Sequence, residues 1–292
     1  MTHSPFMVWL LASRPKTLVA AIVPVIVGAA YAARFGPLPY IILSCILASA
    51  LCIQIATNFA NDYSDFKRGT DVNRQGPTRA TQAGLVQPRQ MKRAAMIAFG
   101  LAAAFGVPLI LRGGWPILMI GIAAIVCGWA YTGGPFPYGY RGLGELFVFI
   151  FFGLAAVMGT VYVLTLDWHP LSLLIAIPSG LHAMALLAVN NIRDMDSDRA
   201  SGKRTLAVIG GRTFARWEFS LFCTLPYIVP VVLFFNGFSN SVLLPLLSLP
   251  LLIVPMGIVI SRTDPIGLIR ALGATARLQL VFGILFAAGL IW

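Results

Sequence analysis

Long apolar stretches separated by short polar segments run along almost the entire chain. A stretch of about 20 mostly apolar residues is long enough to cross a membrane as an α-helix. The pattern predicts about nine transmembrane helices, at roughly 17–34, 39–61, 92–111, 115–133, 144–165, 171–193, 214–235, 240–261 and 271–292. The preceding segment, PFMVWLLASRPKTL, is expected to form a short interfacial helix. We therefore expect an all-α polytopic membrane protein in which residues 1–292 form one bundle and a single domain.

Composition supports a membrane protein. Hydrophobic residues make up 58% of the chain and charged residues 11%, whereas soluble domains carry about 25% charged residues. The net charge of +11 would suggest a nucleic-acid partner in a soluble protein. Placing the N-terminus in the cytoplasm puts 18 of the 21 Lys and Arg residues on that side, where basic residues accumulate in membrane proteins. The topology therefore explains the basic charge, and we expect no nucleic-acid partner.

The scarce acidic residues are concentrated in two stretches. NDYSDFKRGTD at 61–71 and NNIRDMDSDRASGKRTL at 190–206 hold six of the ten. Positions three and four apart share a helix face, so one face of the first stretch carries Asn58, Asn61, Asp62 and Asp65. The second stretch repeats this arrangement with Asn190 or Asn191, Asp194 and Asp198. In the predicted topology both stretches lie at cytoplasmic helix ends, where they could face each other.

The position of these carboxylates predicts a cation between them. Helix C-termini carry a negative dipole end that disfavours carboxylates, and the carboxylates also repel one another. An all-oxygen ligand set favours Mg²⁺ or Mn²⁺. The alternative is a salt-bridged loop in which neighbouring arginines supply the positive charge.

Basic residues follow both acidic stretches and predict an anionic ligand. They are Lys67, Arg68, Arg74 and Arg79 after the first stretch, and Arg199, Lys203 and Arg204 after the second. Protein-bound Mg²⁺ often completes its shell with substrate phosphates, and arginine binds phosphate oxygens with two parallel hydrogen bonds. We therefore expect a diphosphate site at the inner membrane surface, and an adjoining apolar interior suggests a lipid diphosphate.

These stretches resemble the two aspartate-rich motifs of the UbiA-type intramembrane aromatic prenyltransferases. Flanking segments are similar to the branch of that family that uses 1,4-dihydroxy-2-naphthoate in menaquinone biosynthesis: RPKTL at 14–18, GPTRA at 76–80, YTGGPFPYGYRGLGE at 131–145 and DRASGKRTLAV at 198–208. The resemblance extends from Arg14 to about Gly211. The last three predicted helices share little with the family beyond hydrophobicity.

The resemblance implies nine helices around a central cavity that opens to the cytoplasm and to lipid, in the plasma (inner) membrane. It implies Mg²⁺-dependent transfer of a polyprenyl group from polyprenyl diphosphate to 1,4-dihydroxy-2-naphthoate, with loss of CO₂ and diphosphate, giving a demethylmenaquinol. One alternative is another aromatic acceptor, such as 4-hydroxybenzoate or homogentisate. A cation-coupled carrier is a second alternative, although carriers tend to hold their charges near the bilayer midplane.

The resemblance also implies roles for individual residues. The metal ligands would be Asn61, Asp62, Asp65, Asp194 and Asp198, and the four aspartates among them would be catalytic. The expected diphosphate-binding residues are Lys67, Arg79, Arg199 and Lys203.

Three further residues are expected to position the acceptor, and one acid departs from the family pattern. The positioning residues would be Arg141, Glu145 and Asn191, although Arg141 and Glu145 could instead form a local ion pair. Asp71 follows Asp65 by six residues, where the wider family has four, so its role as a ligand stays open. Tyr138 and Tyr140 are expected at the membrane interface, where tyrosines are common.

Overall fold

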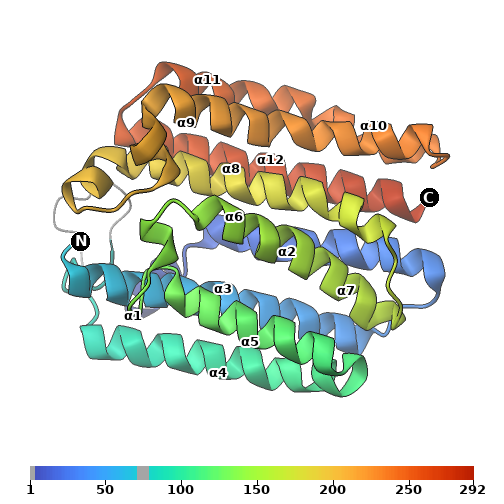
Figure 1. The fold of residues 1–292 in the computed structure, drawn as a ribbon, viewed down its shortest axis with the longest axis horizontal. Coiled ribbons are helices and arrows are strands. Elements are labelled where there is room, and N and C mark those ends of the chain that lie inside the picture. Colours follow the sequence, from blue (N-terminus) through green and yellow to red (C-terminus); the bar gives the residue numbers. More distant parts are fainter. Residues whose placement is uncertain (1–3, 71–78) are drawn as a thin grey trace.

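The structure, a computed structural model, describes residues 4–70 and 79–292 (Figure 1). Within these ranges every regular element is helical. The α-helices are α1 (Pro5–Ala12), α2 (Pro15–Ala32), α3 (Tyr40–Arg68), α4 (Pro88–Gly113), α5 (Trp115–Ala130), α6 (Gly144–Val148), α7 (Ala156–Thr165), α8 (Leu171–Ala200), α9 (Leu206–Thr224), α10 (Ile228–Phe235), α11 (Ile253–Ser261) and α12 (Pro265–Ile291). A π-helical segment, Phe149–Ala155, joins α6 to α7, and a 3-10 segment, Asn240–Leu252, precedes α11.

Each predicted transmembrane segment coincides with helix. Among the described residues, eight helical stretches are long and apolar enough to cross a membrane. The segment predicted at 115–133 corresponds to α5, a shorter apolar helix of 16 residues. Some of the eight stretches are composite, such as Gly144–Thr165, which contains α6, the π-helical segment and α7. The prediction of an all-α polytopic membrane protein is confirmed, and the number of crossings stays a prediction.

Two helices extend well beyond the predicted apolar segments. α3 continues to Arg68 and α8 to Ala200, which makes them 29 and 30 residues long. Helices of this length rise about 44 Å, more than the roughly 30 Å of a bilayer core. Both acid-rich stretches therefore begin as the last turns of continuous helices.

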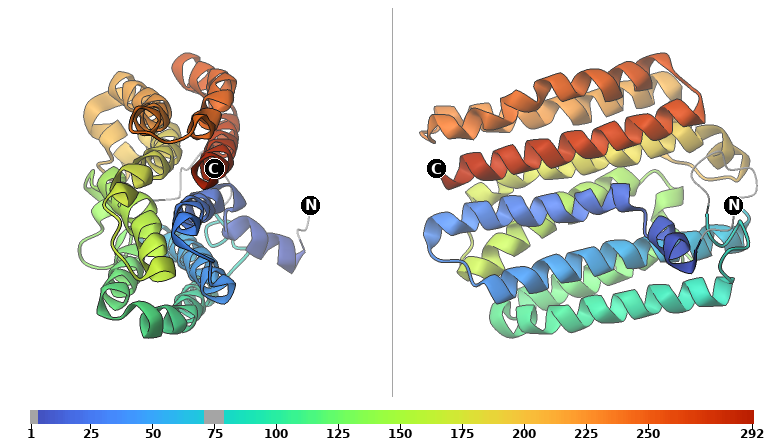
Figure 2. Two further views of the ribbon diagram at one scale, coloured as in Figure 1. Left: turned by 90° about the vertical axis from the view of Figure 1, so that its right-hand side faces the viewer. Right: turned by 180° about the vertical axis from the view of Figure 1, so that it is seen from behind.

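The helices lie side by side along one long axis (Figure 1). The C-terminal ends of α3 and α8 lie at the same end of the bundle as α1, and the C-terminus of the chain lies at the opposite end (Figures 1 and 2). The two acidic stretches therefore share one end of the molecule, as the sequence predicted. The side of the membrane at which this end lies stays a prediction.

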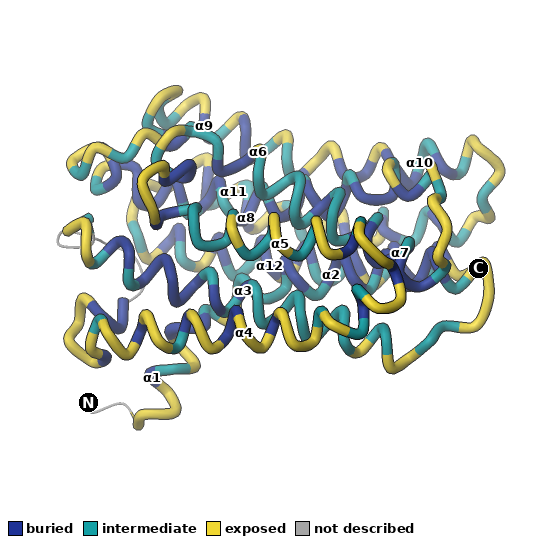
Figure 3. The backbone as a smooth tube through the Cα atoms, turned by 60° about the horizontal axis from the view of Figure 1, so that its bottom comes forward, coloured by how far each residue is buried: buried dark blue, intermediate teal, exposed yellow. Residues whose placement is uncertain are grey.

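Burial varies strongly among the helices. In α8, 67% of the most apolar window is buried, against 11% in α3. Exposed residues follow the outer side of α4 (Figure 3), where Ile97 is 64% and Leu111 82% exposed. Such a continuous apolar exterior is suited to lipid contact, because a soluble protein rarely exposes large apolar patches.

A short helix precedes the first predicted span, as expected. Arg14 separates α1 from α2 with a left-handed φ of 53°. Trp9 of α1 packs edge-to-face against Phe59 of α3, with ring centroids 5.5 Å apart. This contact holds α1 against the acidic end of α3.

Two glycines bring α8 close to the π-helical segment. A Cβ atom on Gly153 would lie 2.9 Å from the Cα of Gly180, and a Cβ on Gly180 would lie 2.6 Å from the Phe149 ring. Small residues allow helix backbones to approach closely in membranes. The missing side chains therefore set the distance between α8 and this segment.

Candidate active site

A cavity of about 420 Å³ lies inside the bundle, lined by α2, α3, α4, α5, α8 and the Gly144–Thr165 stretch. Alanine, glycine and isoleucine residues form much of its wall. The charged residues in its lining, among those the structure describes, are Arg14, Asp65, Arg79, Asp194, Asp198 and Lys203. Both acid-rich stretches therefore contribute to one largely apolar cavity.

Asp65, in the first stretch, is hydrogen-bonded through both carboxylate oxygens. Arg79 Nη2 donates to its Oδ2 at 2.7 Å, and the Tyr140 hydroxyl donates to its Oδ1 at 2.8 Å. Asp65 and Arg79 are both buried. The helix ends at Gly69, whose φ of 71° is one that glycine adopts readily. The carboxylate is thus fixed through both oxygens at the end of α3.

Asn61 also lines the cavity, one helical turn before Asp65. Its Oδ1 accepts a hydrogen bond of 2.8 Å from the Thr132 hydroxyl. Asn58, which the sequence placed on the same face, has another use. Its Nδ2 donates to Ser13 O at 2.9 Å and to Thr17 Oγ1 at 3.1 Å, so it ties α3 to the start of α2.

Asp62 has an orientation that the sequence analysis did not predict. Its two oxygens accept hydrogen bonds from the backbone N–H groups of Ala80 at 3.0 Å and Thr81 at 3.2 Å. Asp62 is absent from the described lining of the cavity. In this structure it anchors the segment that carries Arg79, and its role as a metal ligand stays a prediction.

The second acidic wall belongs to α8. Arg193 Nε and Nη2 donate to the two oxygens of Asp194 at 2.8 and 2.7 Å. The Nζ atom of Lys203 lies 3.5 Å from Asp198 Oδ1. Asp194, Asp198 and Lys203 all line the cavity. The structure therefore places a basic side chain beside Asp65, Asp194 and Asp198, the acids in the described cavity lining, as the salt-bridge alternative required.

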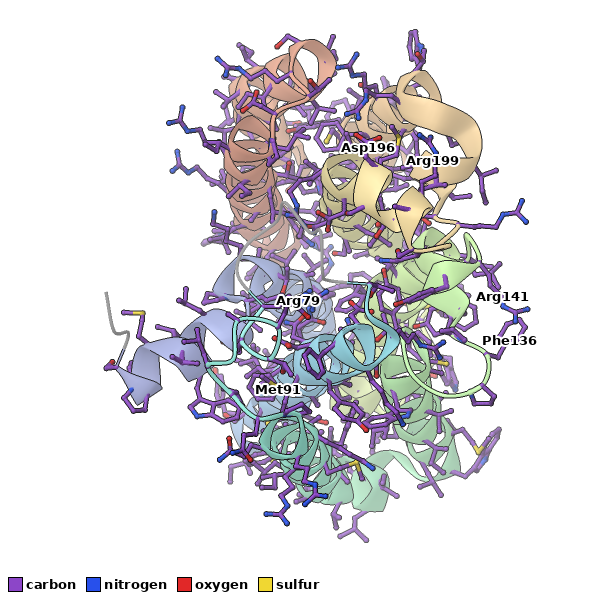
Figure 4. All side chains as sticks on the ribbon, turned by 90° about the vertical axis from the view of Figure 1, so that its left-hand side faces the viewer. Arg79, Met91, Phe136, Arg141, Asp196 and Arg199 are labelled. Atoms are coloured by element: carbon purple, nitrogen blue, oxygen red, sulfur yellow. The ribbon has the colours of Figure 1, made fainter. Side chains whose placement is uncertain are left out.

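Of the three residues expected to position the acceptor, two are in contact and the third lies apart from them. Asn191 lines the cavity and donates to Glu145 Oε1 at 2.7 Å, and Glu145 is buried behind it. Arg141 is exposed, with its guanidinium 3.7 Å from the Phe136 ring centroid (Figure 4). In the described part of the chain no ion pair joins Arg141 to Glu145. The structure thus joins Glu145 to Asn191 and not to Arg141, and the positioning role of all three residues stays a prediction.

The predicted diphosphate-binding residues divide into two groups. Arg79 and Lys203 line the cavity. Lys67 and Arg199 are exposed and absent from its described lining, and Arg199 lies beside Asp196 at the surface, 3.8 Å apart (Figure 4). Lys67 and Arg199 lie in the last turns of α3 and α8, where only one face of each helix turns toward the cavity. Both side chains are on the outer face, so they do not reach the cavity. Asp71 and Arg74 lie outside the described residues.

Tyr140 and Arg193 are site residues that the sequence analysis missed. Burial and the neighbouring Asp65 carboxylate raise the pKa of Tyr140, and its hydroxyl donates to Asp65. The sequence analysis noted the tyrosines of the YGYR segment, but the sequence gives no indication that Tyr140 contacts Asp65. Arg193 is adjacent to Asp194, and neighbouring positions on a helix do not normally face each other.

The donor set fits a divalent metal that is bound together with its substrate. No three His, Cys, Asp or Glu side chains gather as a metal site within 4–70 and 79–292. Carboxylate and amide oxygens from Asn61, Asp65 and Asp198 nevertheless line the same cavity. Mg²⁺ is commonly held by one or two carboxylates plus water and phosphate oxygens, so a preformed three-carboxylate cage is not required.

The chain is similar to known proteins in sequence and in fold. A model described as the UbiA prenyltransferase family matches residues 21–290, so the match includes the last three predicted helices. The 1,4-dihydroxy-2-naphthoate octaprenyltransferase of Escherichia coli (strain K12) is 37% identical, over 97% of this chain and 94% of that protein.

Two solved structures share the architecture. The apo structure of a UbiA homologue from Aeropyrum pernix K1 has a TM-score of 0.72 and 15% identity, covering 92% of this chain and 96% of that one. A UbiA homologue from Archaeoglobus fulgidus, bound to GPP and Mg²⁺, has a TM-score of 0.65 and 14% identity, covering 96% of this chain and 99% of that one. At these identities the likeness shows a common fold.

Proposed function

Because the chain belongs to the UbiA prenyltransferase family, we propose that it transfers a polyprenyl group from polyprenyl diphosphate to 1,4-dihydroxy-2-naphthoate. The reaction would release diphosphate and CO₂ and give a demethylmenaquinol. The observation that carries this proposal is the near full-length identity of 37% to a relative with that activity in its name. The cavity supports it, because it combines two acidic walls with an apolar interior.

The basic residues in the cavity would bind the diphosphate. Arg79 and Lys203 approach it from the first and the second stretch. Asn61, Asp65, Asp194 and Asp198, which line the cavity, would hold Mg²⁺, the ion bound with GPP in the Archaeoglobus fulgidus homologue. Mn²⁺ could replace it because both ions prefer oxygen ligands. The metal, when bound, neutralises negative charge that develops on the departing diphosphate.

The apolar walls would hold the prenyl chain and exclude water from the reacting carbon. Breaking the allylic C–O bond leaves a carbocation, which aromatic faces can stabilise. Phe147 and Phe151 line the cavity, with ring centroids 6.4 Å apart. Attack by the electron-rich naphthoate ring then forms the new C–C bond, and the acceptor loses its carboxylate as CO₂.

The acceptor would lie next to Asn191. The Asn191–Glu145 hydrogen bond of 2.7 Å fixes the amide at the cavity wall. We place this site at the cytoplasmic face of the inner membrane, because most Lys and Arg residues then lie on the cytoplasmic side.

The test is an assay of the purified protein in detergent with polyprenyl diphosphate, a panel of aromatic acids and either Mg²⁺ or EDTA. The proposal predicts diphosphate release that requires both Mg²⁺ and 1,4-dihydroxy-2-naphthoate, with one CO₂ per prenylated product. Product with 4-hydroxybenzoate or homogentisate alone would favour the alternative acceptors. Absence of prenylated product with every acceptor would exclude this family of reactions for the chain.

A further inference from the structure

The loop between α5 and α6 connects the two acidic walls. It covers residues 131–143 and contains a short 3-10 turn, Tyr138–Tyr140. Arg68, at the end of α3, donates to the loop carbonyls of Thr132 at 3.1 Å and Gly134 at 2.7 Å. On the other side, the backbone N–H of Arg204 donates to Tyr140 O at 3.0 Å. The loop is therefore bonded to both acid-rich stretches.

The hydroxyl of Tyr140 makes the link to the first wall. It donates to Asp65 Oδ1 at 2.8 Å, and Thr70 Oγ1 lies 3.2 Å from the same hydroxyl. Arg79 holds the other Asp65 oxygen at 2.7 Å. Without the tyrosine hydroxyl, Oδ1 would lose its neutral donor and the carboxylate could rotate.

The ring of Tyr140 makes the link to the second wall. The Lys203 ammonium lies 5.4 Å from the ring centroid, and the Arg68 guanidinium lies 5.4 Å from it as well. Both distances are within cation–π range. Lys203 in turn pairs with Asp198 at 3.5 Å. One side chain is thus in contact with Asp65 directly and with Asp198 through Lys203.

We propose that Tyr140 is a positioning residue that couples the two acidic walls and orients Asp65 for a divalent metal. Tyr140 is absent from the described cavity lining, so it acts through Asp65 and Lys203. Partners that hydrogen-bond a metal ligand fix its orientation, and changing them typically lowers metal affinity about 10–100-fold. The inference rests on the proposed function, because that function supplies the metal.

The test is Tyr140→Phe, which removes the hydroxyl and keeps the ring. Mn²⁺ binding to the purified protein is measured by EPR titration, both alone and with a non-reacting prenyl diphosphate analogue, at a temperature where circular dichroism shows a fully helical chain. We expect the Kd for Mn²⁺ to rise about 10–100-fold, with a matching rise in the Mg²⁺ concentration needed for turnover and a nearly unchanged kcat at saturating Mg²⁺. Unchanged Mn²⁺ affinity would overturn the proposal.

Tyr138→Phe is the matched control. It makes the same change two residues away in the same turn, and within the described residues the Tyr138 hydroxyl has no hydrogen bond. The ring stacks on Phe147 with centroids 4.2 Å apart, and the variant keeps that contact. We expect its Kd for Mn²⁺ to stay within about twofold of the unmodified protein. Equal weakening in both phenylalanine variants would contradict a specific role for Tyr140.

Tyr140→Leu tests the ring. Loss of the aromatic face removes the cation–π contact that positions the Lys203 ammonium. Because Lys203 would then be less well placed to bind the diphosphate, we expect a KM for prenyl diphosphate higher than that of Tyr140→Phe. Equal KM values in the two variants would contradict the link to the second wall.

The proposed function and this inference fail in different ways. If the unmodified protein binds Mn²⁺ and Tyr140→Phe weakens that binding, the coupling stands even when no naphthoate product forms. If naphthoate is prenylated and Tyr140→Phe binds Mn²⁺ normally, the coupling is wrong and the function stands.

Discussion

Each acid in the cavity lies beside a basic residue, and this pairing decides what single substitutions should do. Asp65 contacts Arg79, Asp194 contacts Arg193 and Asp198 contacts Lys203. Breaking a buried pair leaves a charge without its partner, which is strongly unfavourable. Because the basic partners neutralise these carboxylates, the protein can remain folded without a metal. A metal that binds the carboxylates must compete with the same basic partners.

Neutralising one acid on either wall should abolish catalysis. For Asp65→Asn or Asp198→Asn we expect turnover to fall at least about 100-fold, because losing a metal ligand costs more than losing its outer partner. The control is Asp196→Asn, the same change on α8 at a side chain that is 78% exposed, and its activity should be nearly normal. The measurement is prenylated product per minute at saturating Mg²⁺. Near-normal turnover in Asp65→Asn or Asp198→Asn would remove that residue from the metal site.

Removing Arg79 should have opposite effects on the two ligands. Arg79→Gln takes away the cation that holds Asp65 at 2.7 Å, so Mn²⁺ alone should bind more tightly, while the KM for prenyl diphosphate should rise. EPR titration and steady-state kinetics measure the two quantities. Arg89→Gln, an exposed arginine at the start of α4, serves as the control. If Mn²⁺ bound Arg79→Gln no better than the control, competition between Arg79 and the metal would be ruled out.

Sequence alone predicted acids that the structure places in the cavity lining, but it did not predict how each carboxylate is oriented. Helical spacing correctly placed Asp65 and Asp198 on inward faces. The same spacing placed Asp62 beside them, yet this carboxylate turns to the backbone of Ala80 and Thr81. That contact depends on Ala80, which lies 18 residues further along the chain, and helical periodicity carries no information about contacts with residues outside the helix.

At the scale of secondary structure, hydropathy predicts where helices lie but not where they change type. The segment at 144–165 is one apolar stretch, yet it contains a π-helical segment, Phe149–Ala155. The segment at 240–261 begins with a 3-10 segment, Asn240–Leu252, that contains Pro245 and Pro250. Both changes depend on packing and on proline geometry, since every helix type shows a similar apolar composition.

The contact between Gly153 and Gly180 provides a test at the scale of helices. Gly153→Ala would bring a Cβ to 2.9 Å from the Gly180 Cα, so α8 must shift or the contact must be lost. Overpacking of this kind costs about 1–3 kcal/mol, and we expect a lower Tm by circular dichroism. Gly100→Ala is the matched control, because a Cβ there meets nothing within 4 Å. It should leave Tm unchanged or raise it, since alanine favours helix over glycine. A similar Tm in both variants would argue against tight packing at Gly153.

At the scale of the whole molecule, the two ends of the bundle differ in chemistry. The acidic stretches lie with α1 at one end (Figure 1), and α8 connects this end to the exposed residue Asp167 that precedes it. The sequence predicted that both acidic stretches lie at one end, because the topology inferred from Lys and Arg places both on the same side of the membrane. It did not predict the size of the cavity, because cavity volume depends on how several helices pack together.

Membrane orientation can be tested with two single cysteines in a variant lacking the four native ones. Asp196→Cys and Asp167→Cys place exposed thiols near opposite ends of α8. We expect a membrane-impermeant maleimide to label Asp167→Cys in spheroplasts and Asp196→Cys only in inverted membrane vesicles. The reverse pattern would place the proposed active site on the outer face.

The short helix α5, as a predicted membrane crossing, would have a consequence for the surrounding lipid. Its 16 residues rise roughly 24 Å, less than the roughly 30 Å thickness of a typical hydrocarbon core. A bilayer that meets a short apolar helix thins locally to avoid exposing its acyl chains. α5 also forms part of the cavity wall. Acyl-chain length in the host membrane would therefore act on this wall of the cavity, and bilayer thickness becomes a physical variable of the enzyme alongside its own residues.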